Sequence, residues 1–331
     1  MSALRPSLPS TTLAEETSAM SDVLRHAGPA EPVPHVDPPR ASDSRFAAVV
    51  PHHARLVSLY DQAIFAEGPT WWPARDILVW SDIEGRRVLG WRADGCVRVV
   101  IDATPFINGN TVDRDGNLVH CEHGNRRLSR TTPGGRYEAL VETYEGRRFN
   151  SPNDVICAAD GALWFTDPAY GLRLPKQGAL AESDLGHHSV YRFDPRDGSV
   201  RRMADLGQPN GLAFAPDGRT LYVSDTSRTE GGDGHTIHAY PVLDDRSLGE
   251  RRIFAEVEPG VPDGLRVDGR GWVWSSSEAG VQVYSAEGHR LGLIPTPQVC
   301  SNLCFDPAER RVFITSKAHL YALDLGVGAT R

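Results

Sequence analysis

The chain has 331 residues, a formal net charge of -8 and a pI near 5.8, with 40% hydrophobic and 24% charged residues. This composition is typical of a soluble globular protein, and the acidic balance argues against a nucleic acid or an anionic membrane as partner. No run of about 18 apolar residues occurs, so no membrane span is predicted. The 32 glycines and 24 prolines indicate many turns and favour an all-β chain.

The first part of the chain differs in composition from the rest. Residues 1–45 are rich in Pro, Ser, Ala and charge, which predicts a disordered or extended arm, with a short helix near residues 14–25. The arm lacks the apolar core of a secretory signal, and Glu15 and Glu16 argue against a mitochondrial presequence.

Cysteine usage indicates a reducing, cytoplasmic compartment. The count is odd and shows no metal-type pairing, so neither a disulfide framework nor a zinc site is expected. The five residues are Cys96, Cys121, Cys157, Cys300 and Cys304.

Beyond residue 50 one sequence motif recurs, in which a turn with Asp or Gly leads into a short strand of alternating apolar residues. Its six copies span residues 72–82, 113–120, 159–167, 216–225, 268–275 and 306–315. Strand signals between the copies bring each repeat to about four strands, the content of one propeller blade. The sequence predicts an all-β fold, a six-bladed β-propeller with four-stranded blades and a central metal site, over residues 46–331. We expect the largest insertions in residues 184–252, and the sixfold recurrence disfavours a β-sandwich.

Four oxygen-bearing side chains each precede the turn-strand motif of a repeat: Glu67, Asn153, Asn210 and Asp263. Equivalent positions of successive blades converge on a propeller axis, so these side chains can meet. Carboxylate and amide oxygens suit a calcium-type ion, with magnesium or manganese as alternatives. Asn-Gly and Asp-Gly are also common turn dipeptides, so each position taken alone favours a structural role over a ligand role. Glu67 is a poor turn residue, and the recurrence favours a metal site.

The motifs at residues 66–69, 148–154, 165–168, 209–212 and 262–264 resemble those of the gluconolactonase/regucalcin (senescence marker protein) family. Residues 121–127 are similar to its bacterial and fungal gluconolactonase branch. The resemblance covers residues 55–325 and implies one divalent ion on the axis, held by a Glu, two Asn and an Asp. Those roles fall on Glu67, Asn153, Asn210 and Asp263. The implied ion is Ca²⁺, with Mg²⁺, Mn²⁺ or Zn²⁺ as alternatives.

One ligand is ambiguous in the sequence. Some family members read Arg-Phe-Asn-Asp, whereas this chain inserts Ser151 and Pro152 between Asn150 and the next Asn-Asp pair. Aligning on the following Asp-Gly turn selects Asn153 as ligand and leaves Asn150 as a substrate contact.

The resemblance implies a metal-dependent lactonase that hydrolyses a sugar lactone, such as gluconolactone, to the aldonic acid. Asp263 is the expected base, since it can be ligand and proton acceptor at once. Arg148 and His123 are expected to bind substrate, with a surface ion pair and a packed histidine as the alternative interpretations. Asp167 and Asp225 end strands and are expected to orient ligands or cap turns.

Two other functions remain open. One is hydrolysis of another ester or phosphoester, as in diisopropylfluorophosphatase-like propellers, and the other is a non-catalytic calcium-binding propeller. A small-molecule lactone is the expected partner, and the protein is expected to be a monomer or a small homo-oligomer.

Overall fold

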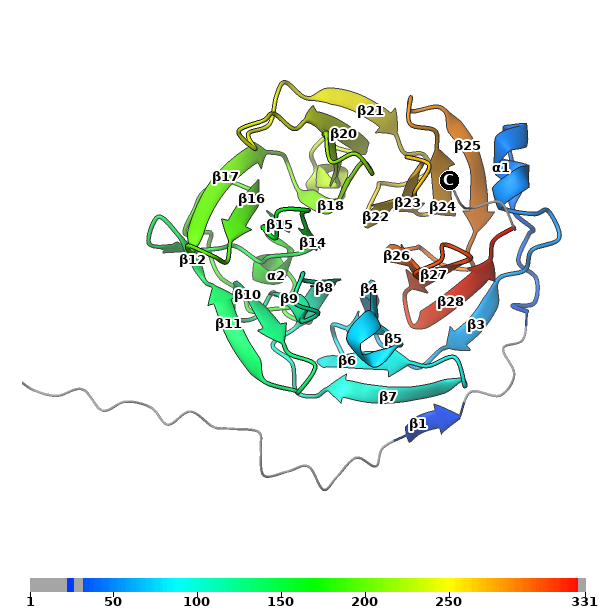
Figure 1. Ribbon diagram of the computed structural model, residues 1–331, viewed down its shortest axis with the longest axis horizontal. Helices are drawn as coiled ribbons and strands as arrows, with labels where there is room; N and C mark the ends of the chain where they lie inside the picture. Colours follow the sequence, from blue (N-terminus) through cyan, green and yellow to red (C-terminus); the bar gives the residue numbers. More distant parts are fainter. Residues whose placement is uncertain (1–22, 27–31, 327–331) are drawn as a thin grey trace, which may run out of the picture.

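The computed structural model describes residues 23–26 and 32–326, which form six antiparallel sheets around a central axis (Figure 1). Each of these six sheets has four blade strands in the same order, with the innermost strand beside the axis and the outermost blade strand at the rim. In two of the sheets a short strand from the N-terminal part of the chain adds a fifth strand at the rim, and a separate two-stranded hairpin lies outside the six sheets. The predicted all-β, six-bladed propeller with four-stranded blades is therefore confirmed.

Five blades run through the chain from the inner strand outward. Blade 1 has β4 (Ala66–Trp72), β5 (Ile77–Asp82), β6 (Arg87–Trp91) and β7 (Cys96–Ile101), and blade 2 has β8 (Ile107–Val112), β9 (Leu118–Glu122), β10 (Arg127–Thr131) and β11 (Tyr137–Val141). Blade 3 has β14 (Val155–Cys157), β15 (Leu163–Asp167), β16 (Ser189–Asp194) and β17 (Ser199–Asp205), and blade 4 has β18 (Pro209–Phe214), β19 (Thr220–Asp225), β20 (Thr236–Pro241) and β21 (Arg252–Glu256). Blade 5 has β22 (Leu265–Val267), β23 (Val273–Ser277), β24 (Gly280–Tyr284) and β25 (Arg290–Pro295).

Blade 6 joins the two ends of the propeller. Its three inner strands come late in the chain, β26 (Asn302–Phe305), β27 (Arg311–Ser316) and β28 (His319–Asp324), whereas its outer strand is β3 (Val57–Tyr60). Leu320 pairs with Tyr60 across β28 and β3. The ring is thus closed by backbone hydrogen bonds between distant segments.

Each of the six repeated motifs forms the second strand of a blade, namely β5, β9, β15, β19, β23 and β27. Their large side chains fill the space between blades, as expected for apolar alternation on two covered faces. Trp80 of blade 1 packs with Phe313 of blade 6, and Trp164 of blade 3 packs with Leu221 of blade 4. Blade-to-blade packing therefore follows directly from the repeat.

The described part of the arm is extended and lies on the rim. β1 (Val23–His26) pairs with β7, β2 (Arg40–Ala41) pairs with β25, and Pro32 bridges to Val57 of β3. These contacts cover the open edges of blades 1, 5 and 6, which would otherwise present unpaired backbone groups. The helix expected near residues 14–25 is wrong for residues 23–25, because their backbone pairs with the edge of blade 1. Residues 14–22 lie outside the described residues.

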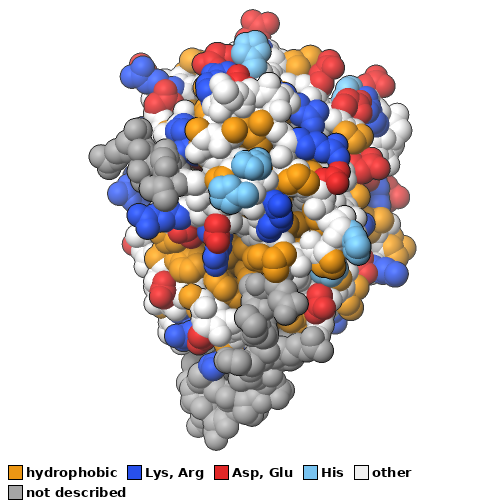
Figure 2. All heavy atoms as spheres, turned by 90° about the vertical axis from the view of Figure 1, so that its right-hand side faces the viewer, with side chains coloured by type: hydrophobic (Ala, Val, Ile, Leu, Met, Phe, Trp, Pro, Cys, Tyr) orange, Lys and Arg blue, Asp and Glu red, His pale blue; other side chains and the backbone are white. Residues whose placement is uncertain are grey.

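The side of the molecule that carries α1 (Ser44–Val49) and the rims of blades 5 and 6 shows acidic and basic side chains interspersed with hydrophobic ones (Figure 2). The arm boundary expected after residue 45 falls within α1. Neither α-helix of the described chain has the length and apolarity needed to cross a membrane.

The long connections lie only partly where expected. The longest link between neighbouring strands of one blade spans residues 168–188, between β15 and β16, and contains α2 (Tyr170–Arg173). The expected region, 184–252, holds the end of this loop and the two next-longest such links, residues 226–235 and 242–251, the first of which contains the 3-10 helix η2 (Ser227–Glu230). A hairpin of β12 (Thr143–Tyr144) and β13 (Arg147–Arg148) precedes blade 3, and η1 (Pro73–Arg75) follows β4.

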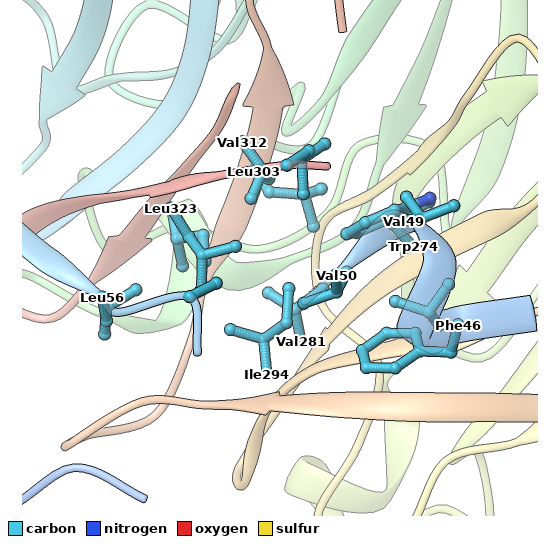
Figure 3. Close-up of a cluster of buried hydrophobic side chains, with 14 of the residues drawn as sticks. Phe46, Val49, Val50, Leu56, Trp274, Val281, Ile294, Leu303, Val312 and Leu323 are labelled. Carbon is cyan, nitrogen blue, oxygen red and sulfur yellow. The ribbon is translucent and has the colours of Figure 1, made fainter. Parts of the chain in front are cut away.

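Helix α1 is held against blade 5 by a hydrophobic cluster. The side chain of Asp43 caps the helix by accepting a hydrogen bond from the Arg45 amide at 2.8 Å. Phe46 is fully buried and lies in one cluster with Trp274 and Ile294 (Figure 3). The helix can approach β25 this closely because residue 292 is glycine. A Cβ at Gly292 would lie 2.5 Å from a ring carbon of Phe46.

We predict that Gly292→Ala lowers the free energy of unfolding by about 1–3 kcal/mol, because overpacking forces the helix away from the sheet. The measurement is urea unfolding at fixed pH. Gly134→Ala is the matched control, since its only close neighbour is the Thr132 hydroxyl at 3.7 Å from the added Cβ. Equal midpoints for the two variants would contradict the account of α1 docking.

Candidate active site on the propeller axis

The four predicted ligands lie at the same end of the inner strands. Glu67 and Asn210 are the second residues of β4 and β18, and Asn153 and Asp263 lie two residues before β14 and β22. The structure brings Glu67, Asn210 and Asp263 together: the charge of Asp263 raises the pKa of Glu67, and the Asn210 amide lowers the pKa of Asp263. Asn153 holds the equivalent place in blade 3, and its side chain makes no hydrogen bond with another described residue.

The glycines of these motifs permit close approach of neighbouring inner strands. A Cβ at Gly211 would lie 2.5 Å from the carbonyl oxygen of Asp263, and one at Gly109 would lie 2.5 Å from that of Asn153. The amides of these two glycines donate hydrogen bonds to the same carbonyls, at 3.1 and 2.8 Å. Asn210-Gly211 is therefore part of strand β18 and not a turn dipeptide. Glycine is needed there for space, since the next blade leaves no room for a side chain.

Hydroxyl groups on the second strands bind the inner strand of the next blade. Thr166 donates a hydrogen bond to the carbonyl of Asn210 at 2.7 Å, and Ser224 donates one to the carbonyl of Asp263 at 2.7 Å. Across the ring closure, Ser301, which directly precedes the inner strand β26, donates to the carbonyl of Ala66, next to Glu67, at 2.7 Å. The backbone at or beside three of the four predicted ligands is thus held by the preceding blade.

The aspartate that follows such a hydroxyl fixes the loop that leads into its own blade. Asp167 accepts hydrogen bonds from the backbone amides of Asn150 and Ser151, both at 2.8 Å. Asp225 accepts one from the amide of Gln208 at 3.1 Å, two residues before Asn210. These contacts to backbone amides are of the loop-capping kind, one of the two roles expected of Asp167 and Asp225.

A third carboxylate lies at the site, and the sequence reasoning did not assign it a role. Asp154 is buried, and one of its oxygens lies 3.1 Å from a guanidinium nitrogen of Arg266. Its negative charge raises the pKa of both Glu67 and Asp263. Its place beside Asn153 is the one signal that could have pointed to it.

Burial and mutual repulsion dominate the electrostatics of the site. Burial, followed by the charge of Asp263, raises the pKa of Glu67 well above its usual range, even though Gly68 donates its amide to Glu67 at 2.8 Å. Burial, followed by the charge of Asp154, raises the pKa of Asp263 to about 7. The protein therefore places more negative charge here than its own cations neutralise.

This donor set fits a hard divalent cation. Two carboxylates and two amide oxygens are ligands of the Ca²⁺ type, and a dication would relieve the repulsion that raises both pKa values. Within the described residues, no three His, Cys, Asp or Glu side chains form a metal-binding group.

His123 lies beside the site under the long connection. It is buried, its Nδ1 lies 3.0 Å from the carbonyl oxygen of Gln177, and its Nε2 lies 3.2 Å from the amide nitrogen of Asn108. The carbonyl requires a proton on Nδ1, so Nε2 is the acceptor. Burial lowers the pKa of His123 to about 4, so the ring is neutral near pH 7.

The other predicted contacts point away from the axis. Arg148 is exposed on β13, and its guanidinium donates to the Asn125 carbonyl at 2.9 Å. Asn150 is buried: its amide nitrogen donates to the carbonyl of His187 at 2.8 Å, and its oxygen accepts from Ser183 at 2.5 Å. With both ends of its amide engaged by the long loop, Asn150 holds that loop in place. This geometry favours Asn153 as the ligand.

The loop of residues 168–188 covers one side of the site entrance. Ser151 donates to the carbonyl of Pro168 at 2.6 Å and accepts from the amide of Gly171 at 3.0 Å. A Cβ at Gly171 would lie 2.7 Å from the Cβ of His123, so glycine allows α2 to pack directly on this histidine. Arg173 forms an ion pair with Glu230 across the loops of blades 3 and 4.

A pocket of about 340 Å³ opens on the other side, next to Asp263. Its walls include the apolar residues Val261, Val299 and Cys300 and the hydroxyl-bearing Thr229. A small molecule bound here would lie directly against Asp263.

The fold and the site together define a six-bladed propeller with an acidic, oxygen-rich centre at one end of its channel. Comparisons with known proteins agree with this description. Residues 65–318 match the family described as SMP-30/Gluconolactonase/LRE-like region. The chain belongs to this family, and the suggested gluconolactonase/regucalcin resemblance is confirmed.

Individual relatives share most of the chain. The gluconolactonase of Zymomonas mobilis is 31% identical over 278 residues, which covers 76% of each protein. The pentonolactonase XacC of Haloferax volcanii is 29% identical over 259 residues, covering 76% of this chain and 80% of that protein. A solved structure of a gluconolactonase from Xanthomonas campestris is 53% identical, with a TM-score of 0.87, and covers 91% of this chain and 99% of that one.

The buried carboxyl of Asp167 predicts a pH effect on stability. Burial raises its pKa to about 7 in the folded protein, whereas an aspartate in the unfolded chain releases its proton near pH 4. Between about pH 4 and 7 the folded state binds the extra proton, so this group makes the protein less stable as pH rises through that window. In Asp167→Asn this contribution is absent.

We therefore expect the free energy of unfolding to fall less in Asp167→Asn than in the wild type between pH 4.5 and 7.5, as measured by urea unfolding. Asp244→Asn, which changes an exposed carboxylate, should follow the wild type. Parallel pH curves for all three proteins would contradict the pKa of Asp167.

Proposed function

We propose that this protein is a metal-dependent lactonase that hydrolyses an aldono-1,5-lactone, such as gluconolactone, to the aldonic acid. The observation that carries the proposal is the meeting of three oxygen-bearing side chains, Glu67, Asn210 and Asp263, at one end of the axis. The 53% identity to the Xanthomonas campestris gluconolactonase over nearly its whole length supports the sugar lactone as substrate class. The haloarchaeal pentonolactonase extends the relevant substrates to five-carbon lactones.

Glu67, Asn153, Asn210 and Asp263 would hold the cation, and Ca²⁺ is the ion that this set of oxygen ligands suits best. When bound, a divalent cation supplies Lewis-acid polarisation of the lactone carbonyl. Asp154 stays paired with Arg266, which holds one of its carboxylate oxygens. Asp154 therefore contributes negative charge to the site and is not proposed as a ligand.

In the reaction, Asp263 accepts a proton from the water that adds to the lactone carbonyl carbon. The ring C–O bond then breaks, and the ring oxygen takes a proton to give the hydroxy acid. A carboxylate held near the charge of Asp154 is more basic than a free one, which suits this role. His123 is fixed as a neutral ring beside the site, because Gln177 and Asn108 engage both of its ring nitrogens. It binds substrate in this proposal only if the Asn108 side-chain amide leaves Nε2.

Arg148 contributes to substrate binding in this proposal only if its side chain leaves the Asn125 carbonyl. Asn150 acts indirectly, because it anchors the loop that covers the site. All five cysteines are free thiols, which supports a reducing, cytoplasmic compartment.

Metal dependence is tested by stripping the protein with a chelator and adding back Ca²⁺, Mg²⁺, Mn²⁺ or Zn²⁺. We expect hydrolysis of glucono-1,5-lactone, followed by acid release, to disappear and to return with one ion. We also expect the melting temperature to rise with that ion, since a ligand at 100 times its Kd stabilises by about 2.7 kcal/mol. In Glu67→Gln the thermal shift should be lost. Full activity after stripping would exclude a metal-dependent mechanism.

The role of Asp263 is tested by Asp263→Asn. Loss of the base should lower kcat by about 10²- to 10⁴-fold. In the cation-free protein at pH 7 the same change should leave the melting temperature unchanged or raise it, because it removes one of the repelling carboxylates. Retained turnover in this variant would exclude Asp263 as the base. If Asp263→Asn lost ion binding and the wild type bound the ion but hydrolysed no lactone, a non-catalytic ion-binding propeller would be favoured.

A further inference from the structure

One buried polar group near the site has no partner in the structure. Tyr170 is the first residue of α2, and its phenol oxygen is buried without a hydrogen bond to any described residue. A buried donor without an acceptor destabilises the folded state, so its presence needs an explanation. An acceptor oxygen on a bound molecule would satisfy this phenol.

The surroundings of Tyr170 indicate where that acceptor lies. Burial raises the pKa of Tyr170 to about 12, and the negative charge of Asp263 adds to this effect. The hydroxyls of Thr226 and Thr229 are also close enough to influence it. Thr229 lines the pocket beside Asp263, so the phenol lies near both the pocket and the proposed base.

The position of Tyr170 is fixed by the contacts of its two neighbours in the chain. The neighbouring Gly171 is fixed by its hydrogen bond to Ser151, and its lack of a side chain lets α2 contact His123. The amide of Ala169 donates to the side-chain oxygen of Gln208 at 3.1 Å on the other side. The residues on both sides of Tyr170 are thus held to blades 3 and 4.

We infer that the Tyr170 hydroxyl donates a hydrogen bond to an oxygen of the bound lactone and positions it against Asp263. A lactone offers its carbonyl oxygen, its ring oxygen and its hydroxyl groups as acceptors. The phenol remains protonated at neutral pH, so it is a donor throughout the reaction. This inference rests on the proposed function, because it concerns the same substrate.

The test compares Tyr170→Phe with Tyr240→Phe. The phenol of Tyr240 on β20 is likewise buried without a partner among the described residues, but it lies in the hydrophobic cluster between blades 3 and 4. Both changes remove one unpartnered hydroxyl, so neither should lower the melting temperature. Only Tyr170→Phe should lower kcat/KM for glucono-1,5-lactone, by about ten- to a hundred-fold, and weaken calorimetric binding of D-gluconate about ten-fold.

The outcomes separate this inference from the proposed function. A wild type that turns over the lactone, with a Tyr170→Phe variant that equals it in kcat/KM and in gluconate binding, overturns the role of Tyr170 alone. A wild type that binds gluconate more tightly than Tyr170→Phe but does not hydrolyse the lactone overturns the proposed reaction alone. A wild type that neither binds nor hydrolyses overturns both. A marked fall in the melting temperature of Tyr170→Phe, absent in Tyr240→Phe, would assign the phenol a structural role instead.

Discussion

Negative charge buried on the propeller axis is the constraint on which this structure depends. Glu67, Asp154 and Asp263 come from three blades. The charges of Asp263 and Asp154 raise the pKa of Glu67, and the charge of Asp154 raises the pKa of Asp263, although Arg266 neutralises part of the charge. Such a cluster is unfavourable by itself. A dication is the simplest group that would turn the repulsion into attraction.

The blades hold this cluster through two repeated devices. The glycine that follows a ligand lets the next inner strand approach within hydrogen-bonding distance, as Gly211 does toward Asp263. The hydroxyl at the end of a second strand then fixes the carbonyl of the ligand in the next blade, as Ser224 does for Asp263. Across the closure of the ring, Ser301, just before the inner strand of blade 6, donates instead to the carbonyl of Ala66, which precedes Glu67. Closing the propeller therefore completes the site as well as the fold.

The sixfold repeat accounts for the proposed ion site on the axis. The proposed reaction also needs a site whose two sides differ, so that the substrate binds in one orientation. The loop of residues 168–188 supplies that asymmetry by covering one side of the entrance and packing on His123. It is anchored by a buried asparagine, Asn150, and by a serine, Ser151, which stand just before Asn153, the proposed ligand. One short segment thus holds both the proposed metal ligand and the cover of the substrate side.

The sequence alone determined the blades. Apolar alternation in short strands, repeated six times, indicates sheets that bury both of their faces by stacking around an axis. It also identified Glu67, Asn210 and Asp263, since equivalent places in a repeat become neighbours on an axis. The choice between Asn150 and Asn153 stayed open, because spacing does not show which amide is already bonded.

Only the tertiary structure decided the contacts between residues that no repeat relates. These include the pairing of Asp154 with Arg266, the cover formed by residues 168–188 and the extended arm on the rim. Each depends on which loop meets which across more than one blade. The physical reason is that local periodicity encodes how a strand buries its face, whereas long-range packing decides which polar groups are left with a partner and which face the ligand.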